Sequence, residues 1–143
     1  MSDPSIETTA LRSMPFFADL SDDDLDGVLG VGRQVSFEPD TPIVEEGDRG
    51  DAMYVILSGQ ARVDVGGRFH ILKAGEFFGE MALIAPSKRM ATVKATEPVE
   101  ALRIPAEDFQ SFLLRHPAVA LSMLKAIVLR LREVEQRVDA WMA

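Results

Sequence analysis

The chain has 143 residues, close to the size of one domain, and 47% of them are hydrophobic, which is enough for one substantial core. Its 15 Lys and Arg residues against 23 Asp and Glu residues give a net charge of −8, which repels nucleic acid unless a local basic patch exists, and the sequence shows no such patch. The absence of cysteine excludes a disulfide framework and a thiolate metal site, and favours a cytoplasmic location.

The sequence also gives no sign of a membrane span. The first residues have neither the basic nor the apolar region of a signal peptide. The longest apolar stretch, 118–131, is interrupted by Ser122, Lys125 and Arg130, and it falls short of the roughly twenty apolar residues that a span requires.

The first 32 residues are predicted to be helical. Ser21 is a suitable N-cap for a helix that opens with Asp22, Asp23 and Asp24. Because the helix dipole favours negative charge in the first turn, we interpret these aspartates as helix chemistry and not as a metal site. A calcium loop would need a different spacing of ligands.

Residues 33–105 change to short alternating runs separated by glycines and prolines, which is typical of β-structure. About eight strands at these intervals predict an antiparallel double-sheet β-roll of the jelly-roll kind, with a hairpin at Gly66 and Gly67. The chain then returns to helix over 106–115, and again from Pro117 to about Met142. We therefore expect a single α+β domain over 1–143, with N-terminal helices, an eight-stranded roll and two C-terminal helices in 106–143.

The most informative segment is 77–93, which combines groups that together suit a phosphate and a sugar. Gly79 lets a ligand approach the main chain, and the turn from Glu80 to Ile84 offers unpaired N–H groups to an anion. Arg89 can close on the same anion from the start of an alternating run, where we expect a strand. A short helical turn is therefore expected inside the roll.

This segment resembles the phosphate-binding cassette of the cyclic nucleotide-binding domains found in protein kinase A regulatory subunits, nucleotide-gated channels and catabolite-activator-type regulators. The residues that carry the resemblance are Phe78, Gly79, Glu80, Met81, Ala82, Leu83, Arg89, Met90, Ala91 and Thr92, here called the cassette. Residues 46–59 are similar to the turn, strand and turn that precede the cassette in that family. The resemblance thus covers most of the chain.

The resemblance implies a role for each matching residue. Glu80 corresponds to the carboxylate that accepts a hydrogen bond from the ribose 2′-hydroxyl, and Arg89 to the guanidinium that pairs with the cyclic phosphate, a contact that suits its fixed donors better than lysine. Backbone N–H groups near Ala82 and Met90 would complete the cradle. With Gly79 and Met81, these residues form the expected ligand site.

Two positions depart from the family pattern, which usually has proline before the arginine and a small residue after it. The chain has Lys88 and Met90 there. Members selective for cyclic GMP are thought to use a threonine hydroxyl after the arginine, and a thioether cannot donate that hydrogen bond. The expected ligand is therefore cyclic AMP, with cyclic GMP as the alternative, and the bulk of Met90 leaves open a narrowed site.

The last helix carries a heptad pattern. Its members are Leu124, Ile127, Leu131, Val134, Val138 and Trp141, here called the seam, with charged residues that include Arg130 around it. The part from Leu124 to Leu131 either packs on the roll or stays exposed. The part beyond Leu131 is expected to pair with a second copy, a partner protein or the bound base.

No catalytic machinery is visible. His70 and His116 stand apart with no matching carboxylate spacing, so we expect them to be structural or exposed, and no metal site. No serine has a nucleophile motif. The expected function is a cyclic nucleotide sensor, without a cofactor, that relays binding through its last helix acting as a lid, with no DNA-binding domain after it. The alternative is a degenerate roll that serves as a protein-interaction module.

Overall fold

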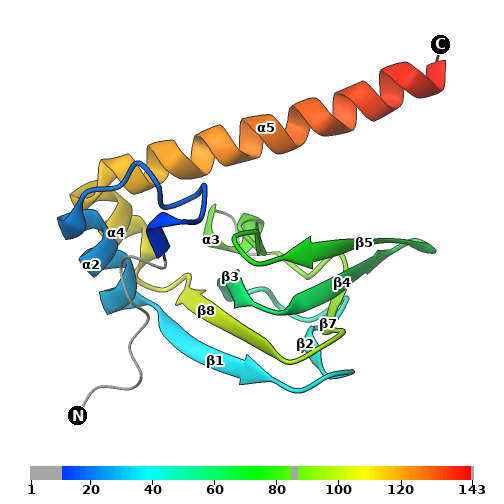
Figure 1. Ribbon diagram of the computed structural model, residues 1–143, viewed down its shortest axis with the longest axis horizontal. Helices are drawn as coiled ribbons and strands as arrows, with labels where there is room; N and C mark the ends of the chain where they lie inside the picture. Colours follow the sequence, from blue (N-terminus) through cyan, green and yellow to red (C-terminus); the bar gives the residue numbers. More distant parts are fainter. Residues whose placement is uncertain (1–10, 85–86, 143) are drawn as a thin grey trace.

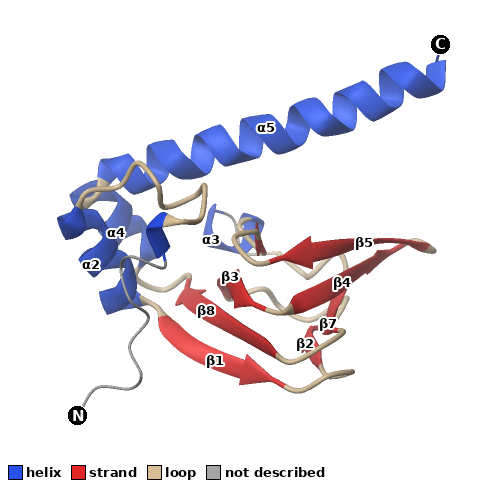
Figure 2. Cartoon of the chain, viewed as in Figure 1, coloured by secondary structure: helices blue, strands red, loops and turns tan. Residues whose placement is uncertain are grey.

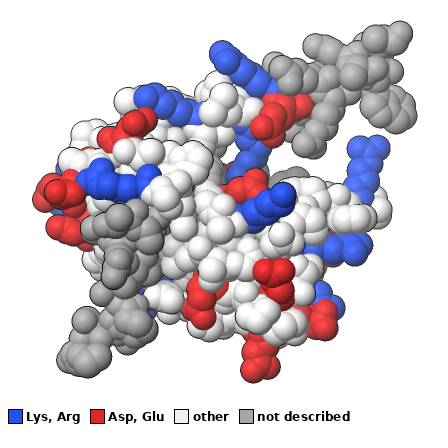
Figure 3. Space-filling view, in the orientation of Figure 1, with Lys and Arg blue, Asp and Glu red and all other residues white. Residues whose placement is uncertain are grey.

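The computed structural model describes residues 11–84 and 87–142, with side chains described as far as Glu133. Helices cover one end and one side of a two-sheet roll (Figures 1 and 2), and basic and acidic side chains are interspersed over the face seen in Figure 3. The elements are α2 (Asp22–Val31), β1 (Arg33–Phe37), β2 (Pro42–Val44), β3 (Ala52–Ser58), β4 (Gln60–Val65), β5 (Arg68–Lys73), β6 (Phe77–Phe78), α3 (Met81–Ile84), β7 (Thr92–Ala95), β8 (Val99–Pro105), α4 (Phe109–Arg115) and α5 (Pro117–Met142).

The eight strands form two four-stranded sheets in which every pair is antiparallel. The first sheet has the order β1-β8-β3-β6, and the second has the order β2-β7-β4-β5. Strands β4 and β5 form the hairpin that the sequence predicted. Its turn is Gly66 and Gly67, both of which have positive φ. The predicted fold class, an α+β antiparallel roll of eight strands, is therefore confirmed.

The first sheet is buried on both faces at its centre, as strand β3 shows. Its alternate residues point in opposite directions: Met53 and Val55 pack in the cluster beneath the helices, whereas Tyr54 and Ile56 pack in the cluster between the two sheets. The strand is consequently a nearly continuous apolar run, and five successive residues from Ala52 are buried. This double burial makes the sheet a rigid base for the segment that follows β6.

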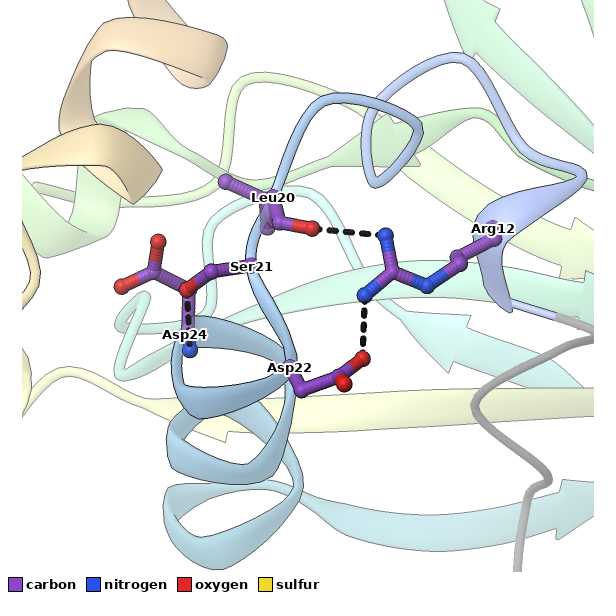
Figure 4. Close-up of polar contacts among 5 residues, drawn as sticks. All are labelled: Arg12, Leu20, Ser21, Asp22 and Asp24. Carbon is purple, nitrogen blue, oxygen red and sulfur yellow. Dashed lines mark hydrogen bonds and ion pairs between the residues drawn. The ribbon is translucent and has the colours of Figure 1, made fainter.

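Helix α2 begins as predicted. The Ser21 hydroxyl accepts a hydrogen bond from the Asp24 backbone N–H at 3.1 Å, and the aspartates occupy the first turn. Figure 4 shows this cap beside a second set of contacts. The Arg12 guanidinium donates a hydrogen bond to the Leu20 carbonyl at 2.7 Å and pairs with the Asp22 carboxylate. The turn over residues 11–20 is thereby fixed to the start of α2.

The C-terminal helices differ slightly from the prediction. Helix α4 begins at Phe109, not at residue 106, because the Ala106 N–H still donates to the Asp51 carbonyl at 2.8 Å and holds the chain against β3. Helix α5 begins at Pro117 as expected, and it leaves α4 at an angle of 109°. In Figure 1 it runs past α3, and its far end extends away from the two sheets. Within the described residues, no single helix has the length and apolar character to cross a membrane; the bent pair Phe109–Arg115 and Pro117–Glu133 reaches that length and composition only when the two helices are taken together.

Candidate functional site

A cavity of about 230 Å³ lies between the second sheet, the segment that contains α3, and α5. Its floor is apolar, with Val63, Leu72 and Val93 from the second sheet. Its rim carries charge, and the cassette residues expected to bind ligand, from Gly79 to Ala82 together with Arg89 and Met90, all line it. An apolar pocket with a few converging charged groups is the usual form of a small-molecule site.

Gly79 is where the cassette backbone and Arg89 meet. Its φ is +83°, in the region that side chains other than glycine rarely adopt. A Cβ atom placed on it would lie 2.5 Å from an Arg89 guanidinium nitrogen and 3.0 Å from the Ala52 carbonyl. Both the backbone conformation and the limited space therefore favour glycine at this position. Because glycine has no Cβ atom, the Arg89 guanidinium can lie directly over the turn.

Arg89 is a half-buried cation that forms no ion pair within the described residues. Its guanidinium donates one hydrogen bond, to the Ala52 carbonyl, at 2.8 Å. A guanidinium has five N–H donors, so most of them are left for another acceptor. A partly desolvated charge next to a glycine turn is a group that attracts an anion.

The expectation that Arg89 begins a strand is wrong in detail. Strand β7 starts at Thr92, and Arg89 lies in the loop before it. Its backbone nevertheless makes strand-like contacts, because its N–H donates to the Asp48 carbonyl at 2.6 Å and its carbonyl accepts from the Gly47 N–H at 2.9 Å. The positive φ of Gly47 allows that turn. The arginine is therefore held firmly, although by a loop pairing.

Glu80 contacts a residue that the sequence did not single out for binding. The carboxylate accepts a hydrogen bond from the Arg130 guanidinium at 3.1 Å, and the same guanidinium donates to the Phe77 carbonyl at 2.7 Å. Arg130 also lies over the Phe77 ring, 4.4 Å from its centroid. The sequence analysis placed Arg130 among charged residues around the seam; the structure places it inside the site, joining α5 to the cassette.

Two cassette positions, Met81 and Met90, are less enclosed. Met81 and Met90 are exposed, at 58% and 70%, on the rim of the cavity, and Lys88 is exposed as well. The Ala82 N–H donates to the Gly79 carbonyl at 3.1 Å within the α3 turn. The expected backbone contribution of Ala82 and Met90 to a ligand therefore stays a prediction.

The seam separates into a described part and a part whose side chains lie outside the described residues. Leu124, Ile127 and Leu131 are all exposed, whereas Met123 and Ala126 pack against the core beneath the helices. The alternative that the first part of the seam packs on the roll is therefore wrong, because α5 turns a neighbouring face inward. Val134, Val138 and Trp141 belong to α5, and their side chains lie outside the described residues.

The two histidines also differ from each other. His70 is exposed and lines the cavity, which fits the expectation of an exposed residue. His116 is half-buried and pairs with Asp24 at 2.9 Å, across 92 positions of sequence. The first-turn aspartates thus complement the helix end as predicted, yet one of them also has a partner that spacing along the sequence could not reveal.

The fold and this site define a class of protein. The cyclic nucleotide-binding domain family matches residues 34–116, more than half of the chain, and the chain belongs to this family. The matched segment contains the whole cassette and most of both sheets. The family is one of regulatory ligand-binding domains, in agreement with the resemblance.

Relatives show the same relation over more of the chain. The cyclic AMP receptor protein of Thermus thermophilus is 31% identical over 135 residues, which are 90% of this chain and 62% of that protein. A cGMP-dependent protein kinase of Toxoplasma gondii is 40% identical over 88 residues, 61% of this chain but 9% of the kinase. The crystal structure of the Thermus thermophilus catabolite activator protein superposes with a TM-score of 0.77 and 32% identity, covering 87% of this chain and 62% of that one. The chain therefore spans less than two thirds of the length of each of these three relatives.

Proposed function

We propose that this chain is a receptor that binds cyclic AMP in the cavity beside α3 and passes the binding event on through α5. The observation that carries the proposal is Arg89, a half-buried cation without an ion-pair partner among the described residues, held over the glycine turn of a family cassette. The cyclic phosphate would pair with this guanidinium. The apolar floor of the cavity would take the less polar parts of the nucleotide.

Glu80 would accept a hydrogen bond from the ribose 2′-hydroxyl, a group that a 3′,5′-cyclic phosphate leaves free. The carboxylate already accepts a bond from Arg130, and a carboxylate has acceptor sites for both partners. Arg130 is the α5 residue, among those described, that lines the cavity. Occupation of the ribose position would therefore change the surroundings of the hydrogen bond between Arg130 of α5 and Glu80 of the cassette.

This arrangement supports a relay by population shift. A ligand shifts a conformational equilibrium only as far as its affinity differs between the two states. When α5 lies over the cavity, Glu80 and Arg130 both border the ligand; when α5 moves away, Arg130 is lost from the site. A nucleotide that contacts both residues therefore favours the state with α5 closed, in which the helix acts as a lid.

The preference for cyclic AMP rests on Met90. Its side chain lines the rim directly after Arg89, where a hydroxyl would be able to meet a guanine amino group. A thioether offers only a weak acceptor and no donor. Cyclic GMP is the alternative ligand that a direct comparison has to test.

The exposed part of α5 supports a second proposal, that the chain pairs with another copy or with a partner protein. Leu121, Leu124, Val128 and Leu131 recur at spacings of three and four residues and are each at least 40% exposed. An apolar stripe of this kind on a long helix is typical of a helix-pairing surface. The same observation favours the alternative function, a protein-interaction module that needs no nucleotide.

Titration calorimetry with cyclic AMP and cyclic GMP tests the proposal and separates the two functions. A receptor binds cyclic AMP with one site per chain and binds cyclic GMP more weakly. A module without nucleotide shows no heat and no thermal shift with either nucleotide at millimolar concentration, and that result would reject the receptor proposal. Sedimentation of the same samples at tens of micromolar then shows whether the chain pairs with itself.

A further inference from the structure

Away from the cavity, three potential metal ligands meet where α2 faces the corner between α4 and α5. His116 lies at the end of α4, and Asp23 and Asp24 lie in the first turn of α2. The His116 Nδ1 atom is 2.9 Å from one Asp24 carboxylate oxygen and 3.8 Å from one Asp23 carboxylate oxygen. One ligand atom from each of the three residues lies within 4.8 Å of the others.

The imidazole is fixed in place by its surroundings. Its ring stacks on Phe112, with 4.8 Å between the ring centroids, and its side chain is only 14% exposed. On the other side it lies against Gly27, where an added Cβ would come within 2.8 Å of Nε2. The ring therefore cannot turn freely, and Nδ1 is kept towards the aspartates.

The carboxylates are held with different degrees of freedom. Asp24 is 14% exposed, and its backbone is fixed by the Ser21 cap; in Figure 4 its carboxylate lies on the side of α2 away from Asp22 and Arg12. Asp23 is 90% exposed, so its side chain can move with little resistance. Two rigid ligands and one adaptable ligand can adjust to an ion without a change in the backbone.

We propose that His116, Asp24 and Asp23 bind one divalent transition-metal ion of the zinc type. Aspartates in the first turn of a helix are explained by the helix dipole alone, but a half-buried imidazole brought to them from α4 is not. In a tetrahedral zinc site with bonds of about 2.0–2.1 Å, neighbouring ligand atoms are about 3.3–3.4 Å apart. Two of the three separations, 2.9 and 3.8 Å, lie on either side of this value, and the third, between the two carboxylates, is at most 4.8 Å; movement of the exposed Asp23 side chain would bring it to the ion.

The ligand set also selects the kind of ion. Two carboxylates neutralise a doubly charged cation, and one imidazole suits zinc, nickel or copper better than calcium or magnesium. Calcium takes six to eight oxygen ligands, far more than this corner supplies. Three protein ligands leave the remaining position to water, and the ion would join α2 to the base of α5.

The test uses the untagged full chain, stripped with a chelator and titrated with Co²⁺ as a spectroscopic probe and with Zn²⁺ by calorimetry. We expect one ion per chain, visible Co²⁺ bands displaced by Zn²⁺, and a higher melting temperature with Zn²⁺. His116→Gln and Asp24→Asn should weaken binding by more than about tenfold. Because these two side chains are partly buried, Asp23→Asn is the safer variant: it leaves the fold intact and should weaken binding several-fold.

The chain offers a matched control for each ligand type. Asp22→Asn removes the same charge from the same helical turn, and His70→Gln removes the other histidine of the described chain. Both should keep the affinity within about twofold, because the Asp22 carboxylate pairs with Arg12 in exposed surroundings, where its charge is screened, and His70 lies in β5. Absence of Co²⁺ binding to the wild-type chain would overturn the proposal. So would binding that survives His116→Gln and Asp23→Asn, or that is lost with His70→Gln. Tighter binding of Ca²⁺ than of Zn²⁺ would also overturn it.

Discussion

Replacement of Arg89 by alanine is the sharpest test of the ligand site. One of the guanidinium donors is already bonded to the Ala52 carbonyl at 2.8 Å, and enough donors remain for a bidentate contact with the cyclic phosphate. Two charge-assisted hydrogen bonds contribute about 1.5–3 kcal/mol each, and water that enters the vacated space offsets part of this sum. We therefore expect Arg89→Ala to weaken binding of cyclic AMP by about 2–4 kcal/mol, or about 30- to 1000-fold.

Calorimetry measures this loss directly, and the neighbouring residue supplies the control. Lys88→Ala removes one positive charge from the adjacent position, but that side chain is exposed on the rim, so the loss should be at most about 1 kcal/mol. Thermal unfolding without ligand should show only about 1 kcal/mol lost in Arg89→Ala, from the bond to Ala52. Equal affinities of Arg89→Ala and the wild type, or equal losses in the two variants, would refute the assignment of the phosphate to Arg89.

Four further outcomes are expected. Met90→Thr should reduce the preference for cyclic AMP over cyclic GMP in a competition titration. Equal affinity of the wild type for the two nucleotides would contradict the role given to Met90. Arg130→Ala should weaken the binding of cyclic AMP by about 1–2 kcal/mol and make α5 more accessible to protease in the bound state. If the arginine has only a structural role, the affinity for the ligand will be unchanged. The hydrogen bond from His116 lowers the pKa of Asp24 below 3.8. The ionised carboxylate therefore stabilises the fold above that pH, and this stabilisation is lost as the pH falls through the lowered pKa. Urea unfolding with a chelator present should show Asp24→Asn less stable than the wild type by about 1–2 kcal/mol at pH 7, and this difference should shrink below pH 3.8. Leu124→Glu with Leu131→Glu should yield monomers in sedimentation if α5 pairs, while leaving nucleotide affinity within a few-fold, and an unchanged mass would reject pairing through this face.

The features that the sequence predicted well depend on local chemistry. Gly79 needs its positive φ because of its own turn, the Ser21 cap needs only the residues that follow it, and the strands of the roll follow from alternation and glycine spacing. The cassette is also contiguous enough to be recognised as a unit. Each of these signals lies within a few residues of the structure it specifies.

The contacts that the sequence did not predict depend on how the C-terminal helices pack. The contacts of Arg130 with Glu80 and of His116 with Asp24 join positions 50 and 92 residues apart. His116 meets Asp24 because the end of α4 lies against the start of α2, and Arg130 meets Glu80 because of the direction in which α5 leaves α4; no local pattern encodes either arrangement. The same direction decides that Met123 faces the core while Leu124 faces outward, so the heptad pattern identified a stripe without showing which way it points.

Helix α5 leaves α4 at an angle of 109° beside His116, so a rotation at this corner would swing the whole helix. The helix rises about 1.5 Å per residue, so Arg130 stands about 20 Å from the corner and the end of the helix about 39 Å from it. A tilt of about 10° at the corner would displace Arg130 by about 3 Å, as much as the whole length of its bond to Glu80, and the far end by about 7 Å. A small rotation where α4 meets α5 is thus enough to break the contact with the cassette. The displacement at the far end of α5 is about twice the displacement at Arg130. Any contact that restricts rotation at the α4–α5 junction, such as a metal ion bound to His116, would therefore restrict the movement of the whole of α5.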